Sequence, residues 1–399
     1  MKFTTLLLAA SIPVVKVIMV TLVGTFIALK RINILNEDGR NHLNKVAFYV
    51  FTPALVYANL AKTLTLHSFI TLWFMPLNIF ITFVIGSILG WVIIRLTRAP
   101  SHLRGLILGC CSAGNLGNML VIIIPAVCKE KGSPFGDHDV CLKFGMAYAS
   151  LSMAIGSIYL WLYVYNIMRI SSSKMIEEIE GSVNGVIEGS LSISSRNGCE
   201  PQLQECSISE DNVEGPGSNK FKQQLKMLAK KINLKRLLAP PTIGAIAGFI
   251  VGVIPPFRRL MIGESAPLHV IQDSAFLLGD GTIPTVSLIM GGNLTRGLKG
   301  SEVHIPVIIG ILIVRNILLP LFGIFIVKGA IHFGMVSSDP LYNFVLLLQF
   351  TLPPAMSIST ISQLFGAGQS ECSVIMLWTY AFASVSLALW TILFMWLVS

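Results

Sequence analysis

The sequence predicts an all-α membrane protein with ten transmembrane helices, because apolar residues are abundant, charged residues are scarce and the apolar residues gather in long blocks. Hydrophobic residues fill 53% of the 399 positions and charged residues 12%, about half the charged share of a soluble domain. The blocks reach roughly 20 residues, the length that crosses a ~30 Å hydrocarbon core. These features exclude a soluble enzyme, a disulfide-stapled secreted domain and a disordered chain.

Ten blocks are long enough to be spans, and one hydrophilic segment divides them five and five. We expect the spans at 6–29, 44–61, 69–95, 103–127, 142–168, 237–255, 268–292, 303–327, 342–365 and 373–398. The predicted domains are a first membrane repeat (1–168), a hydrophilic loop (169–236) and a second membrane repeat (237–399). Because five is an odd number, the second repeat starts on the opposite side of the membrane, and the repeats are predicted to be inverted.

The hydrophilic loop is rich in Ser, Gly, Asn and Glu and contains one aromatic residue, Phe221. Such a segment buries too little apolar area to offset its ordering entropy, so most of it is expected to be disordered. Its end, 221–238, places Phe221, Leu225, Leu228 and Ile232 on one helical face, with lysines on the remainder. That pattern is typical of a basic amphipathic helix on an anionic membrane surface. A partner-binding helix is the alternative.

The distribution of basic residues predicts the orientation in the membrane. Of the 29 Lys and Arg residues, 19 fall on the side that holds the central loop, 8 on the opposite side and two inside spans. The positive-inside rule then places the central loop in the cytosol and both termini in a lumen or outside. The net charge of +9 is therefore explained by membrane topology, and nucleic acid is not an expected partner.

Seven cysteines are scattered without a CxxC pair, so neither a zinc cluster nor a redox motif is predicted. Cys128 and Cys141 flank a short polar loop. They would be able to form a disulfide if that loop lies in an oxidising compartment, and the predicted topology puts it on the lumenal side. No cofactor and no metal are expected.

The fourth and ninth spans, which are equivalent in the two repeats, both contain helix breakers at mid-depth. The fourth reads GNLGNMLVIIIPAV (114–127) and the ninth LPPAMSISTISQLFG (352–366). Pro353 and Pro354 interrupt the helical hydrogen bonds of the ninth span, and Pro125 lies in the fourth. A packing kink explains one such span well. A matched pair instead points to a transporter binding site.

A break at mid-depth exposes helix N-termini whose partial positive charge suits an anionic group. Asn115 and Asn118 add amide donors in the fourth span, while Ser357, Ser359 and Thr360 add hydroxyls in the ninth. The sequence therefore favours a site for a small anion between the two broken helices.

Two ionisable residues fall inside predicted spans, where a charge is costly and commonly functional. They are Asp280 and Arg315. Asp280 would carry a proton, orient the crossing or pair with Arg315, and a structural ion pair is as well supported as a functional role. Enzyme motifs such as HExxH, GxxxxGK[ST] and GxSxG are missing, so we do not expect an enzyme.

At these residues the chain resembles the PIN-LIKES branch of the auxin efflux carrier family of plants. The strings that carry the resemblance are CSAGNLGNMLVIIIPAVC (111–128), SPFGDHDVC (133–141), APPTIGAIAGFIVG (239–252) and LPPAMSIS (352–359). The resemblance implies a scaffold of helices 1, 2, 6 and 7 and a moving transport domain of helices 3–5 and 8–10, with helices 4 and 9 crossed. It also implies residence in the endoplasmic reticulum membrane and movement of auxin, chiefly indole-3-acetic acid, from the cytosol into the lumen.

The match to the motifs of the PIN carriers is partial. Segments that correspond are Gly117-Asn118, Ile124-Pro125, Leu352-Pro353, Thr52-Pro53 and Asp280-Gly281-Thr282. The sixth span departs, because Ala239-Pro240-Pro241-Thr242 stands where those carriers have Asn-Pro-Asn-Thr. Substrate contacts from that helix are therefore in question.

We predict a carrier for a small aromatic carboxylate that works by an elevator-type movement. The residues predicted to bind substrate are Tyr49, Thr52, Pro53, Tyr57, Asn115, Gly117, Asn118, Pro353, Pro354, Ser357 and Ser359, with Pro125 and Pro353 as structural residues of the crossover. The lipid bilayer is the expected environment, and homodimerisation is left open. The alternatives are a sodium- or proton-coupled transporter of another organic anion, and a non-transporting membrane receptor or scaffold.

Overall fold

The computed structural model describes residues 3–63, 65, 70–129, 134–173, 239–263, 265–300, 304–337 and 339–398, without the side chains of 3–14, 118, 122 and 296–300. The described parts of both membrane halves form one compact unit. The predictions for the central loop concern residues outside these ranges, apart from 169–173, and its basic end at 221–238 lies wholly outside them.

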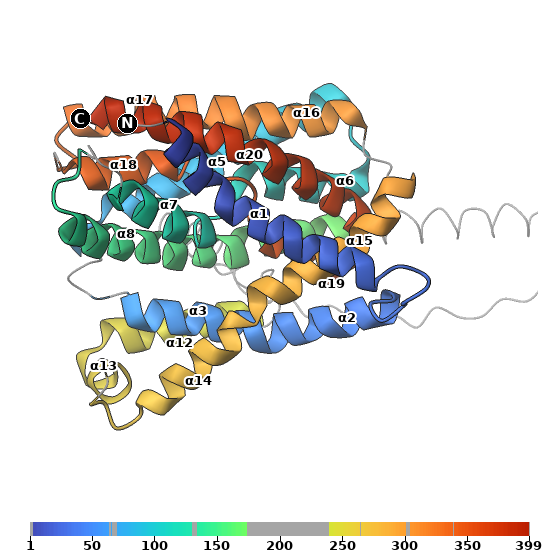
Figure 1. Ribbon diagram of the computed structural model, residues 1–399, viewed down its shortest axis with the longest axis horizontal. Helices are drawn as coiled ribbons and strands as arrows, with labels where there is room; N and C mark the ends of the chain where they lie inside the picture. Colours follow the sequence, from blue (N-terminus) through green and yellow to red (C-terminus); the bar gives the residue numbers. More distant parts are fainter. Residues whose placement is uncertain are drawn as a thin grey trace, which may run out of the picture. The chain divides into compact units, whose positions relative to one another are not determined.

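Within these ranges the protein is helical, with no strand beyond one isolated bridge, as Figure 1 shows. The first half comprises α1 (Phe3–Ile27), α2 (Glu37–Val46), η1 (Ala47–Phe51), α3 (Thr52–Thr63), α5 (Phe74–Thr97), α6 (Ser101–Ser112), α7 (Asn118–Lys129), α8 (His138–Tyr159) and η2 (Leu160–Val164). The second half comprises α12 (Pro240–Val253), α13 (Pro255–Met261), α14 (His269–Asp280), α15 (Thr282–Gly300), α16 (Ile305–Ile313), η3 (Val314–Leu318), α17 (Leu319–His332), α18 (Pro340–Leu348), α19 (Ser357–Phe365) and α20 (Gln369–Val398).

Five helices in the described residues are long and apolar enough to cross a bilayer, or six if α12 and α13, which meet at 100°, form one span. They are Phe74–Thr97, His138–Ser173, His269–Thr295, Ile305–His332 and Gln369–Val398. The number of ten spans stays a prediction. The helix of the second expected span begins earlier than 44, at Glu37, where the Asn36 side chain accepts a hydrogen bond from the backbone N–H of Gly39 at 2.7 Å.

Two of the π-helical turns end two residues before a proline. η1 precedes Pro53 and η3 precedes Pro320, and a proline has no N–H for the carbonyl four residues earlier. In η3 that carbonyl belongs to Asn316, and the indole N–H of Trp390 donates to it at 2.8 Å. The widened turn is therefore fixed by a contact with α20.

The helix α3 packs against α12 and α14, and these three helices lie side by side in the lower part of Figure 1. Glycines permit the close approach. A Cβ added at Gly248 would lie 2.7 Å from the carbonyl oxygen of Tyr57 and 2.9 Å from Cβ of Leu60. Small residues of this kind are what close packing of membrane helices requires.

Replacing Gly248 with isoleucine is expected to lower the stability of the protein by about 1–3 kcal/mol, because the added side chain overpacks the α3–α12 contact. Thermal unfolding of the detergent-purified protein measures the effect. Gly329→Ile is the matched control, since Gly329 also lies in a helix and a Cβ there meets nothing within 4 Å. Equal melting temperatures for the two variants would contradict the packing argument.

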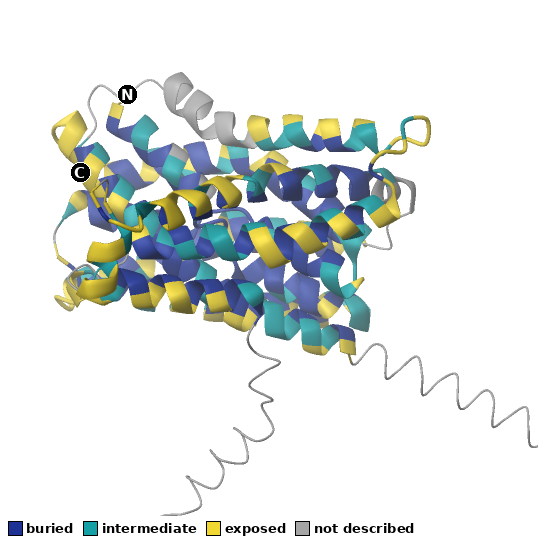
Figure 2. Cartoon of the chain, turned by 90° about the horizontal axis from the view of Figure 1, so that it is seen from below, coloured by how far each residue is buried: buried dark blue, intermediate teal, exposed yellow. Residues whose placement is uncertain are grey.

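The outer faces of the helices are apolar. Leu96, Leu277, Phe325 and Trp396 expose between 74% and 78% of their surface, and Figure 2 shows exposed residues on the outer helical faces around a buried interior. A soluble protein rarely exposes large apolar side chains in such number. This surface fits a multi-pass protein in a lipid bilayer.

Candidate functional site

Two pairs of consecutive helices, α6/α7 and α18/α19, are each separated by a short non-helical segment, and the two segments lie side by side. α6 ends at Ser112 and α7 begins at Asn118, while α18 ends at Leu348 and α19 begins at Ser357. The second interruption follows from the sequence, because Pro353 and Pro354 lack N–H groups and a residue before proline is driven to an extended conformation. We call the paired segments 113–117 and 349–356 the crossover.

The two extended segments satisfy each other's backbone. Gly114 and Pro354 form an antiparallel bridge, the N–H of Asn115 donates to the carbonyl of Pro353 at 2.8 Å, and the N–H of Ala355 donates to the carbonyl of Ala113 at 2.9 Å. Lipid cannot hydrogen-bond to free backbone groups, so irregular backbone within a membrane must be paired or line a cavity. The crossover does both.

Two helices start at the crossover and two end there. In the first turn of α19, the N–H groups of Ile358 and Ser359 donate to the carbonyls of Ala355 and Met356 at 3.1 and 3.0 Å. Each helix start still carries a partial positive charge of about half a unit. A small anion is the ligand that such a pair of helix starts favours.

The amide of Asn115 has a fixed orientation. The hydroxyl of Tyr380 donates to the carbonyl of Pro354 at 3.0 Å, so its oxygen must accept the other contact, from Nδ2 of Asn115 at 2.8 Å. A phenol has one proton, and a carbonyl only accepts. Oδ1 of Asn115 and the second N–H of the amide are therefore left for other partners.

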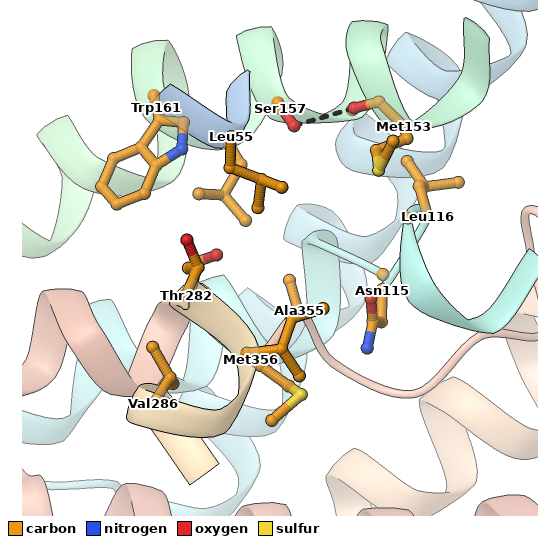
Figure 3. Close-up of a pocket in the computed structure, with 16 residues that line it drawn as sticks. Leu55, Asn115, Leu116, Met153, Ser157, Trp161, Thr282, Val286, Ala355 and Met356 are labelled. Carbon is orange, nitrogen blue, oxygen red and sulfur yellow. Dashed lines mark hydrogen bonds between the residues drawn. The ribbon is translucent and has the colours of Figure 1, made fainter. Parts of the chain in front are cut away.

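A cavity of about 80 Å³ adjoins the crossover. Figure 3 shows Asn115, Ala355 and Met356 on one side of it, and Leu55, Trp161 and Thr282 on the other. Its further lining comes from Gly114, Leu116, Gly117, Met153, Gly156, Ser157, Leu160, Ile283, Val286 and Ser357. The cavity thus combines polar groups of the crossover with an indole ring and aliphatic side chains.

The predicted substrate residues divide into two groups. Asn115, Gly117 and Ser357 line the cavity. Asn118 begins α7, but its side chain lies outside the described part. The other predicted residues are not among the lining residues; they are Tyr49, Thr52, Pro53, Tyr57, Pro353, Pro354 and Ser359.

Those other residues have identifiable surroundings. Tyr49 is 60% exposed, and the hydroxyl of Tyr57 lies 3.6 Å from Sδ of Met261. Pro353 and Pro354 shape the crossover backbone, and Pro125 lies inside α7. The aromatic group at the cavity is instead Trp161, which the sequence did not indicate because a single Trp in an apolar span has no spacing that distinguishes it.

Asp280 and Arg315 do not form an ion pair in the described structure. Asp280 is exposed at the end of α14. Arg315 is buried in η3, where its Nε donates to the carbonyl of Cys110 at 2.7 Å, and its two terminal nitrogens have no hydrogen-bond partner among the described residues. Arg315 therefore contacts the end of α6 and not Asp280.

Cys128 and Cys141 are joined by a disulfide, with their Cα atoms 5.7 Å apart. The bond ties the end of α7 to the start of α8. Within the described ranges no cluster of three or more His, Cys, Asp or Glu residues is arranged to hold a metal ion.

A larger cavity, of about 540 Å³, lies between α3, α13 and α14. Lys62 places its ammonium 5.0 Å from the ring centre of Phe276 there, and Asp273 lies in the same wall. This cavity touches neither interrupted helix among its described lining residues, so it lacks the helix starts that distinguish the crossover.

The comparisons with known proteins agree with a transport role. Residues 9–391 match the model of a family described as membrane transport protein. The chain is 51% identical to Protein PIN-LIKES 1 of Arabidopsis thaliana over its whole length and 81% of that protein. It is 50% identical to PIN-LIKES 3 and 46% identical to PIN-LIKES 4 of the same plant, in each case over the full length of this chain and of the relative.

The chain belongs to the PIN-LIKES family of membrane transport proteins. This is a transporter family rather than an enzyme family. The family membership extends over both membrane halves, including the two segments of the crossover, so the cavity described above is a candidate PIN-LIKES transport site.

Proposed function

We propose that the chain carries a small aromatic carboxylate, indole-3-acetic acid, from the cytosol into the lumen of the endoplasmic reticulum and thereby regulates intracellular auxin. The observation that carries this proposal is the crossover, where two helix starts and Asn115 adjoin a cavity with an aromatic wall. The carboxylate would lie at the helix starts, and the indole ring would lie against Trp161.

The proposed mechanism is an elevator-type movement of one group of helices against another. The scaffold would contain α1, α2–α3, α12–α13 and α14–α15, and the moving group would contain α5–α8 and α16–α20, as two inverted five-helix repeats. The cavity lies between these groups, because Leu55 and Thr282 come from the first and Asn115, Trp161 and Ala355 from the second. A site at such a boundary suits alternating access.

The small size of the cavity supports a closed conformation. At about 80 Å³ it is well below the roughly 300–1,000 Å³ of pockets that hold drug-sized ligands. Room for the cargo would come from separation of the two groups of helices.

The proposed orientation has both termini in the lumen and the central loop in the cytosol. The start of α1 and the end of α20 lie at the same end of the bundle in Figure 1. The Cys128–Cys141 disulfide supports an oxidising compartment on that side of the membrane.

Uptake of labelled indole-3-acetic acid into proteoliposomes tests the proposal. We expect saturable uptake by the purified protein that empty liposomes do not show, measured with and without sodium and with and without a pH gradient. Sodium dependence or dependence on the pH gradient would identify a coupling ion. Saturable binding without uptake would favour a receptor, and no saturable uptake or binding would favour a transporter of another organic anion; either of these two results would contradict the proposed carrier.

The disulfide gives a separate test of orientation. In intact microsomes, Cys128 and Cys141 are expected to resist a membrane-permeant maleimide until a reductant that also crosses the membrane is added. A reductant that cannot cross the membrane should leave them unlabelled. Labelling after the impermeant reductant alone would place the α7–α8 loop on the cytosolic side and contradict the orientation.

A further inference from the structure

Arg315 is a buried cation whose donors are mostly unused. Its side chain is 1% exposed, and a guanidinium has five N–H donors. One donor is satisfied, because Nε donates to the carbonyl of Cys110 at 2.7 Å. Both terminal nitrogens are buried without a hydrogen-bond partner among the described residues.

The satisfied donor has a structural explanation. Cys110 lies in the last turn of α6, where carbonyls lack intrahelical partners, and a cation at a helix C-terminus is stabilising. One N–H is enough for that role. It leaves the planar fork of Nη1 and Nη2 unexplained. A charge inside a membrane protein is energetically costly, and residues that carry one commonly have a function.

The unused fork lies against the crossover. A Cβ built at Gly114 would lie 3.3 Å from Nη1 of Arg315 and 3.4 Å from Cβ of Leu352. The guanidinium therefore touches the side of Gly114 where any other residue would carry a side chain, next to both extended segments. Gly114 itself lines the cavity, whereas Arg315 is not among the lining residues.

We infer that Arg315 sets the charge selectivity of the crossover site, by placing a full positive charge behind Gly114 that favours a carboxylate over a neutral cargo of the same shape. The inference rests on the proposed function and adds the residue that selects an anion. Arg315 is a positioning charge in this conformation, since Gly114 stands between it and the cavity. The partial charges of α7 and α19 act in the same direction.

The test compares indole-3-acetate with its neutral isostere indole-3-acetamide, both for uptake into proteoliposomes and for thermal stabilisation of the purified protein. The wild type is expected to prefer the acetate by at least about tenfold. Arg315→Met should reduce that preference about tenfold or more. The variant should still fold, since an apolar residue of similar length removes an unpaired buried charge, which offsets the loss of the donor to the carbonyl of Cys110. Arg315→Lys keeps the charge and should keep most of the preference.

The matched control is Arg95→Met, because Arg95 lies on the outer part of α5 with its guanidinium 5.1 Å from the ring centre of Trp91. It should leave the preference unchanged. If Arg315→Met does not fold, Arg315→Gln serves instead, since its amide offers a donor for the carbonyl of Cys110 without the positive charge, and a reduced preference is again expected. An unchanged preference in the folded variant would show that Arg315 only terminates α6 and would overturn the inference.

The two measurements separate the inference from the proposed function. A wild type that takes up neither compound contradicts the carrier. In that case, stabilisation by the acetate, absent with the acetamide and lost in Arg315→Met, still supports the role of Arg315. Equal stabilisation by both compounds, or by neither, overturns it.

Discussion

Replacing Asn115 with leucine is expected to reduce uptake of indole-3-acetic acid roughly 100-fold. The leucine removes the polar group that faces the cavity from the crossover, and a hydrogen bond to a charged group contributes about 1.5–3 kcal/mol, where each 1.4 kcal/mol is tenfold. It also leaves the oxygen of Tyr380 without the donor that Nδ2 supplies. Uptake into proteoliposomes with matched protein content measures the loss.

Asn316→Leu is the control for this substitution. The Asn316 side chain donates to the carbonyl of Leu312 in its own helix at 3.0 Å, and it lies in an outer groove beside Trp390 rather than at the crossover. Its uptake should stay within about twofold of the wild type, as expected for a change away from the site. Unchanged uptake by Asn115→Leu would remove Asn115 from the binding site.

Replacing Gln363 with leucine is expected to weaken the contacts of α19 with α2 and α15 and so make the cavity at the crossover more accessible. Nε2 of Gln363 donates to Oδ1 of Asn41 at 2.6 Å, and its Oε1 accepts from Nδ2 of Asn293 at 2.7 Å. Beside them, Nδ2 of Asn44 donates to the carbonyl of Thr360 at 3.1 Å. These amides, of which only Asn41 is half-buried rather than buried, hold α19 of the proposed moving group against α2 and α15 of the proposed scaffold.

The substitution removes the hydrogen-bond partners of Oδ1 of Asn41 and Nδ2 of Asn293. A buried polar group without a partner costs about 1–3 kcal/mol. The closed arrangement should therefore lose population by at least about tenfold. The readout is the rate at which a maleimide labels Ser357→Cys, a position that lines the cavity, and the rate should rise by a similar factor. Among the described residues the free thiols, Cys110, Cys111 and Cys372, are buried. Cys199 and Cys206 lie outside the described ranges and are replaced by serine in all the variants compared.

Gln272→Leu is the matched control for Gln363→Leu. Gln272 is also buried, and its Nε2 donates to the carbonyl of Ala58 at 2.7 Å, but both residues lie in the proposed scaffold. This variant should melt at a lower temperature with no faster labelling of Ser357→Cys. Similar labelling rates in both variants would show that Gln363 supports general stability and does not close the site.

The sequence predicted the parts of the site that depend on local chain chemistry. Pro353 and Pro354 cannot continue a helix, so the interruption between α18 and α19 was expected at those residues. The helical character of the apolar blocks followed in the same way from their length and composition. Asn115, Gly117 and Ser357 were named because they adjoin such breaks.

The residues that were missed depend on tertiary structure. Tyr380 lies 265 positions from Asn115 along the chain, and nothing in its neighbourhood distinguishes it from other aromatic residues of an apolar helix. Tyr49 was expected at the ring of the cargo, but the π-helical turn η1 sets the direction of side chains there, and Tyr49 is exposed. The partner of Arg315 was likewise decided by packing, because Cys110 and not Asp280 lies within its reach.

The central claim is that the cargo binds at the crossover, and photolabelling with an azido derivative of indole-3-acetic acid tests it most directly. The account predicts that the label, competed by unlabelled indole-3-acetic acid, attaches to peptides that contain Trp161 or Met356, the side chains that line the crossover cavity. Competed labelling at Met261 or Phe276, in the larger cavity beside Lys62, would contradict the account and move the site to the scaffold.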